Sequence, residues 1–348
     1  MIAPYGSRAH YFDHMVPTWL ALPLEAQAPA RAPGEVAHRL MRRGLRAGTG
    51  SPGRGELALV ASGGDARALR PRTVALVEHG AGQAYDVADG GYSGGPGRDN
   101  VVLFLCPNET SARRNRAAYP RAAVEVVGSP RVEALRSVAG TSPDGRGEAT
   151  GSSPGRQRRQ DGPPAVALSF HFDSPMRVRV PEAGSALEHY RPGLERAITE
   201  MRGAGLEVLG HGHPRGGQRM ARLWRRLGVE WVPDFADVVA RASAYACDNS
   251  STLYEAAACG IPVVVMNAPW YRRGLDAWPR FWRCADVGIQ VDGPGALADA
   301  LAAALEDPPE VAARRAEVVA EVYPLLGGAA KRSAHALLET YAAVASPR

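Results

Sequence analysis

Short apolar runs alternate with polar segments of helical spacing along the first half of the chain. The apolar runs predict buried strands, and the spacing of the segments between them predicts helices. The predicted strands cover 1–5, 57–61, 73–77, 101–106 and 124–127, and the predicted helices cover 11–22 and 111–119. Strands that alternate with helices in this way favour βαβ units and a parallel sheet.

The pattern breaks between residues 140 and 164, where Gly, Ser, Pro and Arg dominate and large apolar residues are almost missing. Such a composition is typical of a flexible linker or a disordered loop. A second series of the same kind follows. Its predicted strands cover 165–170, 206–210, 229–232, 243–247, 262–266 and 288–291, and its predicted helices cover 187–202, 218–227, 235–242, 295–306, 310–323 and 329–344.

Two such series joined by a linker predict an α/β protein with two doubly wound, Rossmann-like domains that face each other across a cleft. We expect the domains at 1–139 and 165–328, the linker at 140–164 and a separate C-terminal helix within 329–348. A chain of 348 residues with 45% hydrophobic content is long enough for two such cores.

The formal charge is +5, and almost all of the positive charge is Arg, since Lys331 is the sole lysine. A moderately basic surface favours anionic partners such as nucleotides, polyphosphate polymers, nucleic acid or acidic lipid headgroups, although a generic Arg-rich surface is the simpler interpretation. The cysteines Cys106, Cys247, Cys259 and Cys284 form no C-x-x-C pair. They predict buried reduced thiols rather than a zinc site. With no signal peptide and no apolar run of membrane-spanning length, a cytoplasmic protein is expected.

Polar clusters stand at the ends of several predicted strands. They are Gly6-Ser7-Arg8, His79-Gly80, His211 to Arg215, and Asp248 to Ser251. In open α/β sheets, ligands bind beyond the carboxyl ends of the strands. The clusters therefore predict a ligand site at these ends.

The segment from Asp248 to Glu255 predicts a strand end, a tight polar turn and a helix start. Ser250, Ser251 and Thr252 at a helix start satisfy orphan backbone N–H groups, and N–H groups that stay open can hold a phosphate at the positive end of the helix dipole. Glu255, about one turn later, is placed to accept hydrogen bonds from a ribose or sugar hydroxyl. The alternative is an ordinary helix cap with a solvated Glu.

Two histidines are candidates for proton transfer. His79 follows a buried strand and precedes Gly80, and its ordinary pKa suits it to take a proton from an acceptor hydroxyl. The alternative is a structural role, in which His79 only makes a hydrogen bond within the turn. His213 and Arg215 are placed to bind a phosphate or to protonate a leaving group. His211 and His213 also hint at a metal, but no Cys or carboxylate cluster completes a ligand set.

Further polar residues are expected on the acceptor side of the cleft. They are Arg8, His10, His14, Gly80 and Gln83, for which a solvated surface is the alternative. The chain lacks a P-loop, a G-x-G-x-x-G after a strand and a G-x-S-x-G elbow. Their absence argues against kinases, simple dinucleotide enzymes and α/β-hydrolases.

With these motifs the chain resembles the GT-B group of transferases, and most of all the CDP-glycerol glycerophosphotransferase (teichoic-acid polymerase) family. The resemblance rests on His79-Gly80, His213-Pro214, Asp248-x-Ser250-Ser251 and the Gly128-Ser129-Pro130 segment. It covers most of the chain after Thr73.

The resemblance implies an acceptor-side first domain, a donor-binding second domain and a last helix that packs back on the first. It makes His79 the base that activates an acceptor hydroxyl and His213 the group that stabilises charge on the donor diphosphate. Arg215, Asp248, Ser250, Ser251 and Thr252 would bind the diphosphate, and Glu255 the ribose or the transferred group. It implies no metal and no cofactor, because protein dipoles and cations neutralise the leaving group.

The expected reaction moves a glycosyl or glycerol-phosphate group from a nucleotide-diphosphate donor to an acceptor hydroxyl, with the acceptor a small molecule or a polyanionic polymer. A UDP-sugar 2-epimerase of the same fold is the first alternative. A glycosyltransferase that acts on modified DNA, and a GT-B-like binding module without turnover, are the others. Peripheral contact with a membrane or with nucleic acid stays open.

Overall fold

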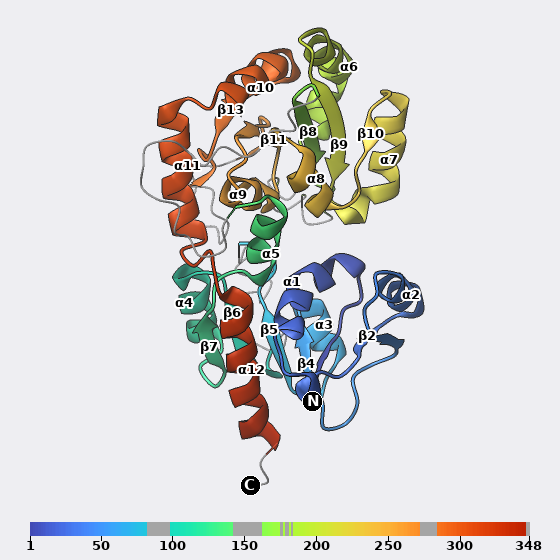
Figure 1. The fold of residues 1–348 in the computed structure, drawn as a ribbon, viewed down its shortest axis with the longest axis vertical. Coiled ribbons are helices and arrows are strands. Elements are labelled where there is room, and N and C mark those ends of the chain that lie inside the picture. The colour runs from blue at the N-terminus through green and yellow to red at the C-terminus, as the bar shows by residue number, and fades with distance from the viewer. Residues whose placement is uncertain are drawn as a thin grey trace. The chain divides into compact units, whose positions relative to one another are not determined.

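A computed structural model describes residues 1–81, 98–141, 162–174, 177, 181, 184–271 and 284–345 (Figure 1). Within these ranges the chain divides into two compact units. Unit 1 takes Met1–Ala134 and Val322–Arg348, and unit 2 takes Leu135–Ser142 and Arg146–Glu321. Gln83 and most of the predicted linker lie outside the described residues.

Unit 1 is built on a parallel sheet whose strand order is β1-β4-β5-β6-β7. Its strands are β1 (Ile2–Pro4), β2 (Ala30–Ala32), β3 (Ala47–Thr49), β4 (Leu57–Val60), β5 (Val74–Val77), β6 (Val101–Cys106) and β7 (Ala123–Val126). The helices are α1 (Ala9–Leu20), α2 (Gly34–Arg42), α3 (Gly63–Ala68), α4 (Glu109–Ala118), α5 (Pro130–Val138, which ends in unit 2) and α12 (Ala329–Ala345), with the short η1 (Leu24–Ala26).

Strands β2 and β3 pair in parallel, and a bridge from Arg31 to Tyr5 sets them beside β1. The strand order therefore reverses between β1 and β4, which is the switch point where a doubly wound sheet binds ligands. The turns after these strands are linked, because the Asp65 carboxylate accepts a hydrogen bond from the Ser7 backbone N–H (3.3 Å). Asp65 itself is held by a backbone bond to Ser62 Oγ (3.0 Å) that caps α3.

The last helix, α12, belongs to unit 1. The Glu133 carboxylate accepts hydrogen bonds from the backbone N–H groups of Gly328 and Ala330, both at 2.8 Å, and so satisfies orphan donors at the start of this helix. Leu337 packs into the core that α1 shares with the sheet.

Unit 2 is built on a second parallel sheet, with strand order β10-β9-β8-β11-β12-β13. Its strands are β8 (Ala165–Phe170), β9 (Glu207–Gly212), β10 (Glu230–Trp231), β11 (Ala244–Cys247), β12 (Val263–Met266) and β13 (Ile289–Val291). The helices are α6 (Leu187–Gly203), α7 (Gly217–Arg226), α8 (Phe235–Arg241), α9 (Thr252–Ala258), α10 (Leu297–Glu306) and α11 (Pro309–Val322), with the short η4 (Pro214–Gly216) and η6 (Pro294–Ala296). The order reverses between β8 and β11, so the switch point of this unit lies there.

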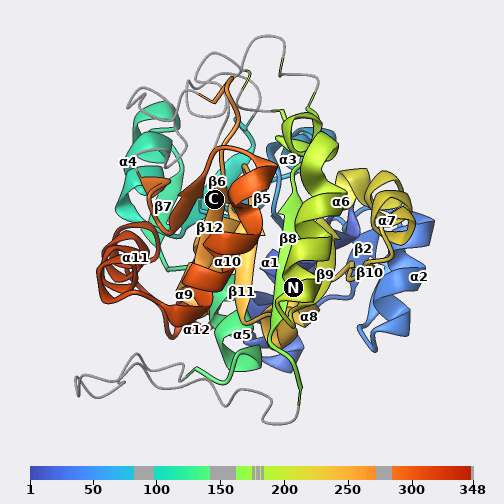
Figure 2. The same ribbon diagram turned by 90° about the horizontal axis from the view of Figure 1, so that it is seen from above.

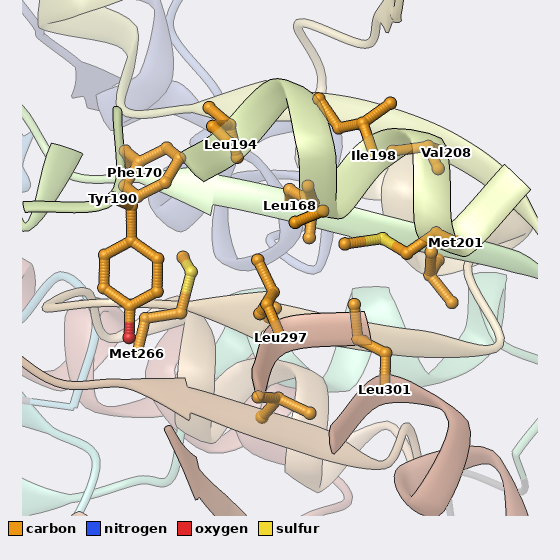
Figure 3. Close-up of a cluster of buried hydrophobic side chains, with 14 of the residues drawn as sticks. Leu168, Phe170, Tyr190, Leu194, Ile198, Met201, Val208, Met266, Leu297 and Leu301 are labelled. Carbon is orange, nitrogen blue, oxygen red and sulfur yellow. The ribbon is translucent and has the colours of Figure 1, made fainter. Parts of the chain in front are cut away.

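Both faces of each sheet are covered, which explains the continuous apolar runs of the strands. In β4, Leu57 and Leu59 enter one core, and Ala58 and Val60 enter the other. In unit 2, α6 contacts β9, and α10 lies over β11 and β12 (Figure 2). Figure 3 shows their side chains interleaved with those of the sheet: Leu168, Leu194, Ile198, Leu297 and Leu301. Among the described residues, no helix combines the length and the apolar character needed to cross a bilayer.

Candidate functional site

In unit 2, Asp248 closes the end of β11 and is fully buried. Its carboxylate accepts hydrogen bonds from the backbone N–H groups of His171 (2.8 Å), Ala186 (2.8 Å) and Asn249 (2.7 Å), and from Ser185 Oγ (3.2 Å). Burial raises the pKa of this carboxyl, and the hydrogen bonds oppose that shift. Because Asp248 has no exposed surface, the expectation that it contacts a diphosphate is corrected. It instead joins the ends of β8 and β11 to the start of α6.

The turn that follows Asp248 leads into α9. Ser250 Oγ accepts a hydrogen bond from the Thr252 backbone N–H (3.3 Å), and the Thr252 hydroxyl lies 2.8 Å from that of Tyr245. In the part of the chain that the structure describes, the backbone N–H groups of Ser250 and Ser251 have no protein acceptor. Both residues are half-buried.

Glu255 is 2% exposed and accepts a hydrogen bond from Ser251 Oγ (3.3 Å). The solvated Glu that we considered as an alternative is therefore wrong. The carboxylate holds the turn from within, and its contact with a ribose or with a transferred group stays a prediction.

His213 stands at the end of β9, beside the switch point. Its Nδ1 accepts a hydrogen bond from the Arg215 backbone N–H (3.1 Å), so a neutral His213 carries its proton on Nε2. The His213 ring lies edge-on to the His171 ring, with centroids 4.9 Å apart. The exposed Arg215 guanidinium lies 5.1 Å from the Phe172 ring centre. His171 therefore connects His213 to the Asp248 turn, whereas His211 is buried and bonds the Val232 carbonyl (2.7 Å).

In unit 1, His79 follows β5 and has an exposed ring. The surrounding protein partly desolvates the imidazole and lowers its pKa, although the Glu78 carboxylate and a hydrogen bond to the Ala61 backbone oppose the shift. Gly80, next to it, has a φ of 66°, a conformation that favours glycine. A lowered pKa keeps the imidazole neutral near pH 7, as a proton acceptor requires.

Side chains of α1 gather around His79. The Tyr11 and His14 rings lie 5.7 and 5.8 Å from the His79 ring, between centroids, and the His10 ring lies 4.4 Å from that of Tyr11. His14 is 5% exposed and receives a hydrogen bond from Arg131 (3.2 Å). The solvated helix face that was the alternative for His14 is therefore wrong. Arg8 is exposed and makes no side-chain cap for α1.

Several residues of this region were not singled out from the sequence. Glu78 is buried and accepts hydrogen bonds from Asn115 Nδ2 (2.9 Å) and from Arg98 (3.5 Å). Its position directly before His79 was the available signal, whereas nothing local marks Asn115 or Arg98. Within the described ranges, no three His, Cys, Asp or Glu side chains are grouped as metal ligands.

Comparison with known proteins identifies the fold. No family model matches the chain, and no curated protein matches it. A variant of the wall teichoic acid polymerase TagF soaked with CDPG matches 99% of this chain and 90% of its own, at 9% identity and a TM-score of 0.62. The S. aureus MnaA–UDP structure matches 97% of this chain and 96% of its own, at 13% identity and a TM-score of 0.58. The Neisseria meningitidis UDP-GlcNAc 2-epimerase bound to UDP-GlcNAc matches 97% and 99%, at 14% identity and a TM-score of 0.57.

These structures belong to GT-B fold enzymes. The chain therefore has the GT-B fold, with two Rossmann-like α/β domains, as the sequence predicted.

Proposed function

We propose that the chain is an enzyme that uses a nucleotide-diphosphate-linked donor, and that it transfers a glycosyl or glycerol-phosphate group to an acceptor hydroxyl. The observation that carries this proposal is a pair of backbone N–H groups, at Ser250 and Ser251, that have no acceptor among the described residues and stand at the switch point of unit 2. Open N–H groups at a turn into a helix bind phosphate oxygens. The GT-B neighbours solved with UDP or soaked with CDPG support the same assignment.

In this proposal His213 and Arg215 add donors and positive charge near the diphosphate, and Thr252 and Glu255 complete the donor site. Stabilisation of the negative charge on the leaving nucleotide by such fixed donors requires no metal. His79 takes the proton of the acceptor hydroxyl, because its lowered pKa keeps it neutral.

The first experiment is thermal stabilisation by CDP, UDP, GDP, dTDP and ADP, each with EDTA present. A ligand that binds only the folded state raises the melting temperature by mass action. A shift with CDP alone would favour a glycerol-phosphate donor, and a shift with UDP, GDP or dTDP would favour a sugar donor. No shift with any of them would refute the donor site.

A double variant and a control test whether the donor site lies at the turn before α9. The double substitution Ser250→Ala and Ser251→Ala should weaken nucleotide binding, because both hydroxyls hold the turn. Thr199→Ala is the control, since it removes a hydroxyl from the exposed face of α6. If the double variant and Thr199→Ala bind the nucleotide with equal affinity, the phosphate site lies elsewhere.

A UDP-sugar 2-epimerase is the second candidate, favoured by the likeness to epimerase structures. Incubation with UDP-GlcNAc and no acceptor separates the two. An epimerase forms the C2 epimer, which proton NMR detects, whereas a transferase leaves the sugar configuration unchanged until an acceptor hydroxyl is added. In either case His79→Ala should lower turnover at least about a hundredfold with little loss of stability. Steep salt dependence of acceptor binding would identify a polyanionic acceptor, including DNA.

A further inference from the structure

The inference concerns the hydrogen-bonding state of His14 in α1. Arg131 Nη1 lies 3.2 Å from His14 Nε2. A guanidinium has only donors and stays protonated in proteins, so Nε2 must be the acceptor of this bond. A neutral imidazole has one N–H, which here is left on Nδ1.

The surroundings of His14 favour this neutral form. Burial is the main cause that lowers its pKa, and Arg131, His79 and His10 act in the same direction. The one nearby carboxylate on the same helix, Asp13, is already engaged by Arg131 (3.7 Å) and Arg43 (3.2 Å). His14 is therefore held as a neutral ring whose orientation Arg131 fixes.

The Nδ1–H group of His14 is left without a partner among the described residues. His79 supplies the complementary group. A neutral imidazole has one N–H and one acceptor nitrogen, and the Ala61 backbone, which raises the pKa of His79, favours the N–H on the nitrogen that faces it, so the other nitrogen is the acceptor. The two ring centres are 5.8 Å apart, so a ligand oxygen beside the line that joins them can lie about 2.8 Å from a nitrogen of each ring.

The His14 donor and the His79 acceptor together match a hydroxyl group, which both accepts and donates a hydrogen bond. A phosphate or carboxylate oxygen only accepts hydrogen bonds and would need two donors. We propose that His14, fixed in the Nδ1–H form by Arg131, donates a hydrogen bond to the same acceptor hydroxyl whose proton His79 receives. His14 is then a binding residue that selects a neutral hydroxyl, and Arg131 is a positioning residue.

This proposal rests on the proposed function for the role of His79. As the hydroxyl O–H bond breaks, its proton passes to the acceptor nitrogen of His79, and the oxygen bonds the transferred group while the bond to the nucleotide breaks. A nucleoside diphosphate leaves if the group is a glycosyl group, and a nucleoside monophosphate leaves if it is glycerol-phosphate. The His14 bond strengthens as negative charge grows on that oxygen. The proton stays on His14 throughout.

The test is NMR of the full chain labelled with ¹⁵N-histidine at pH 7, with the His14 signals assigned by their loss in His14→Gln. The expected pattern is a protonated Nδ1 and an unprotonated Nε2. Arg131→Met should abolish that preference. Arg43→Met is the matched control, since Arg43 also binds Asp13 whereas the bond to His14 Nε2 comes from Arg131, and it should leave the pattern unchanged. Protonation on Nε2, or on both nitrogens, in the unaltered chain would overturn the proposal.

Steady-state kinetics of His14 variants test the binding role directly. His14→Asn keeps an N–H donor near the Nδ1 position, whereas His14→Leu removes it. We expect His14→Leu to raise the acceptor KM by about tenfold, as the loss of one hydrogen bond does, and His14→Asn to restore most of it. An equal acceptor KM in His14→Leu and in the unaltered chain would overturn the binding role. Failure of every nucleoside diphosphate to bind would instead reject the proposed function, and the NMR result would still decide the tautomer.

Discussion

The substitution Asp248→Asn tests how the turn before α9 is built. It preserves the shape of the side chain and exchanges one carboxylate oxygen for an NH₂ group. Oδ1 accepts from the backbone of His171 and Asn249, and Oδ2 accepts from the backbone of Ala186 and from Ser185 Oγ. An amide can satisfy the first pair with its oxygen, and its NH₂ can donate to the Ser185 hydroxyl. It cannot satisfy the Ala186 N–H.

The expected cost follows from this count. An orphaned buried N–H costs about 1–3 kcal/mol, and the remaining hydrogen bonds lose the advantage of a charged acceptor, worth about 1 kcal/mol or more each. Relief of the buried charge, whose desolvation raises the pKa of Asp248, offsets part of this. We therefore expect Asp248→Asn to lower the free energy of unfolding of unit 2 by about 2–4 kcal/mol. Asp248→Ala, which leaves the backbone N–H groups of His171, Ala186 and Asn249 without their acceptor, should cost more.

Urea unfolding followed by tryptophan fluorescence measures this cost. Of the six tryptophans only Trp19 falls in unit 1, so the signal reports chiefly on unit 2. Asp237→Asn is the control, because Asp237 is exposed, and its transition should hardly move. A loss below about 1 kcal/mol in Asp248→Asn would refute the view that this carboxylate organises the turn.

Three further results are expected. Because the pKa of His14 lies well below its ordinary value of 6.5 in the folded chain, only the unfolded chain gains this proton just below that pH. The free energy of unfolding should therefore fall as pH drops from 7 to about 5, and less steeply in His14→Gln; equal slopes in urea titrations would contradict this. Gly288→Ala drives a Cβ into the Val263 carbonyl oxygen and should cost about 1–3 kcal/mol, whereas Gly295→Ala meets nothing within 4 Å; equal melting temperatures of the two variants would contradict the packing. Burial raises the pKa of the Cys106 and Cys247 thiols to about 12, so a thiol reagent at pH 8 should modify them only after unfolding, as mass spectrometry would show.

The central strands β4, β5, β8, β11 and β12, which the sequence predicted, are buried along their whole length, whereas the predicted edge strands β7, β10 and β13 are partly exposed. Leu57–Val60 alternates between two cores, so every position is apolar and the run is plain without any alignment. Strands β2 and β3 were missed because each has three residues, and Ala, Arg, Gly and Thr form no apolar run. They are placed by pairing with each other and by a bridge to Tyr5, which is a tertiary effect.

For the candidate sites too, the sequence predicted what depends on position along the chain and missed what depends on tertiary contacts. The rule that ligands bind at strand ends pointed to His79, His213 and Asp248, because position along the chain fixes where a strand ends. The partners of these residues could not be predicted. Asp248 is buried by groups 62–77 residues away along the chain, and Arg131 reaches His14 across 117. A site residue and a structural one can share the same motif, and only such long-range contacts distinguish them.

The long-range contacts determine which charged and hydrogen-bonding groups each unit presents to a ligand. In unit 2 the carboxylates of Asp248 and Glu255 at the turn are both buried. The groups left to meet a ligand there are the backbone N–H donors of Ser250 and Ser251, His213 and the exposed Arg215 cation, a set that suits an anion. In unit 1 the basic Arg131 is directed at His14 and Asp13, and the His79 and His14 rings stay neutral. A neutral donor–acceptor pair binds a hydroxyl without competing for phosphate. This electrostatic difference between the two units fits the proposed reaction between a diphosphate-linked donor and an alcohol. It predicts that free nucleoside diphosphate binds with nearly the same affinity when His14 and His79 are both replaced by Gln.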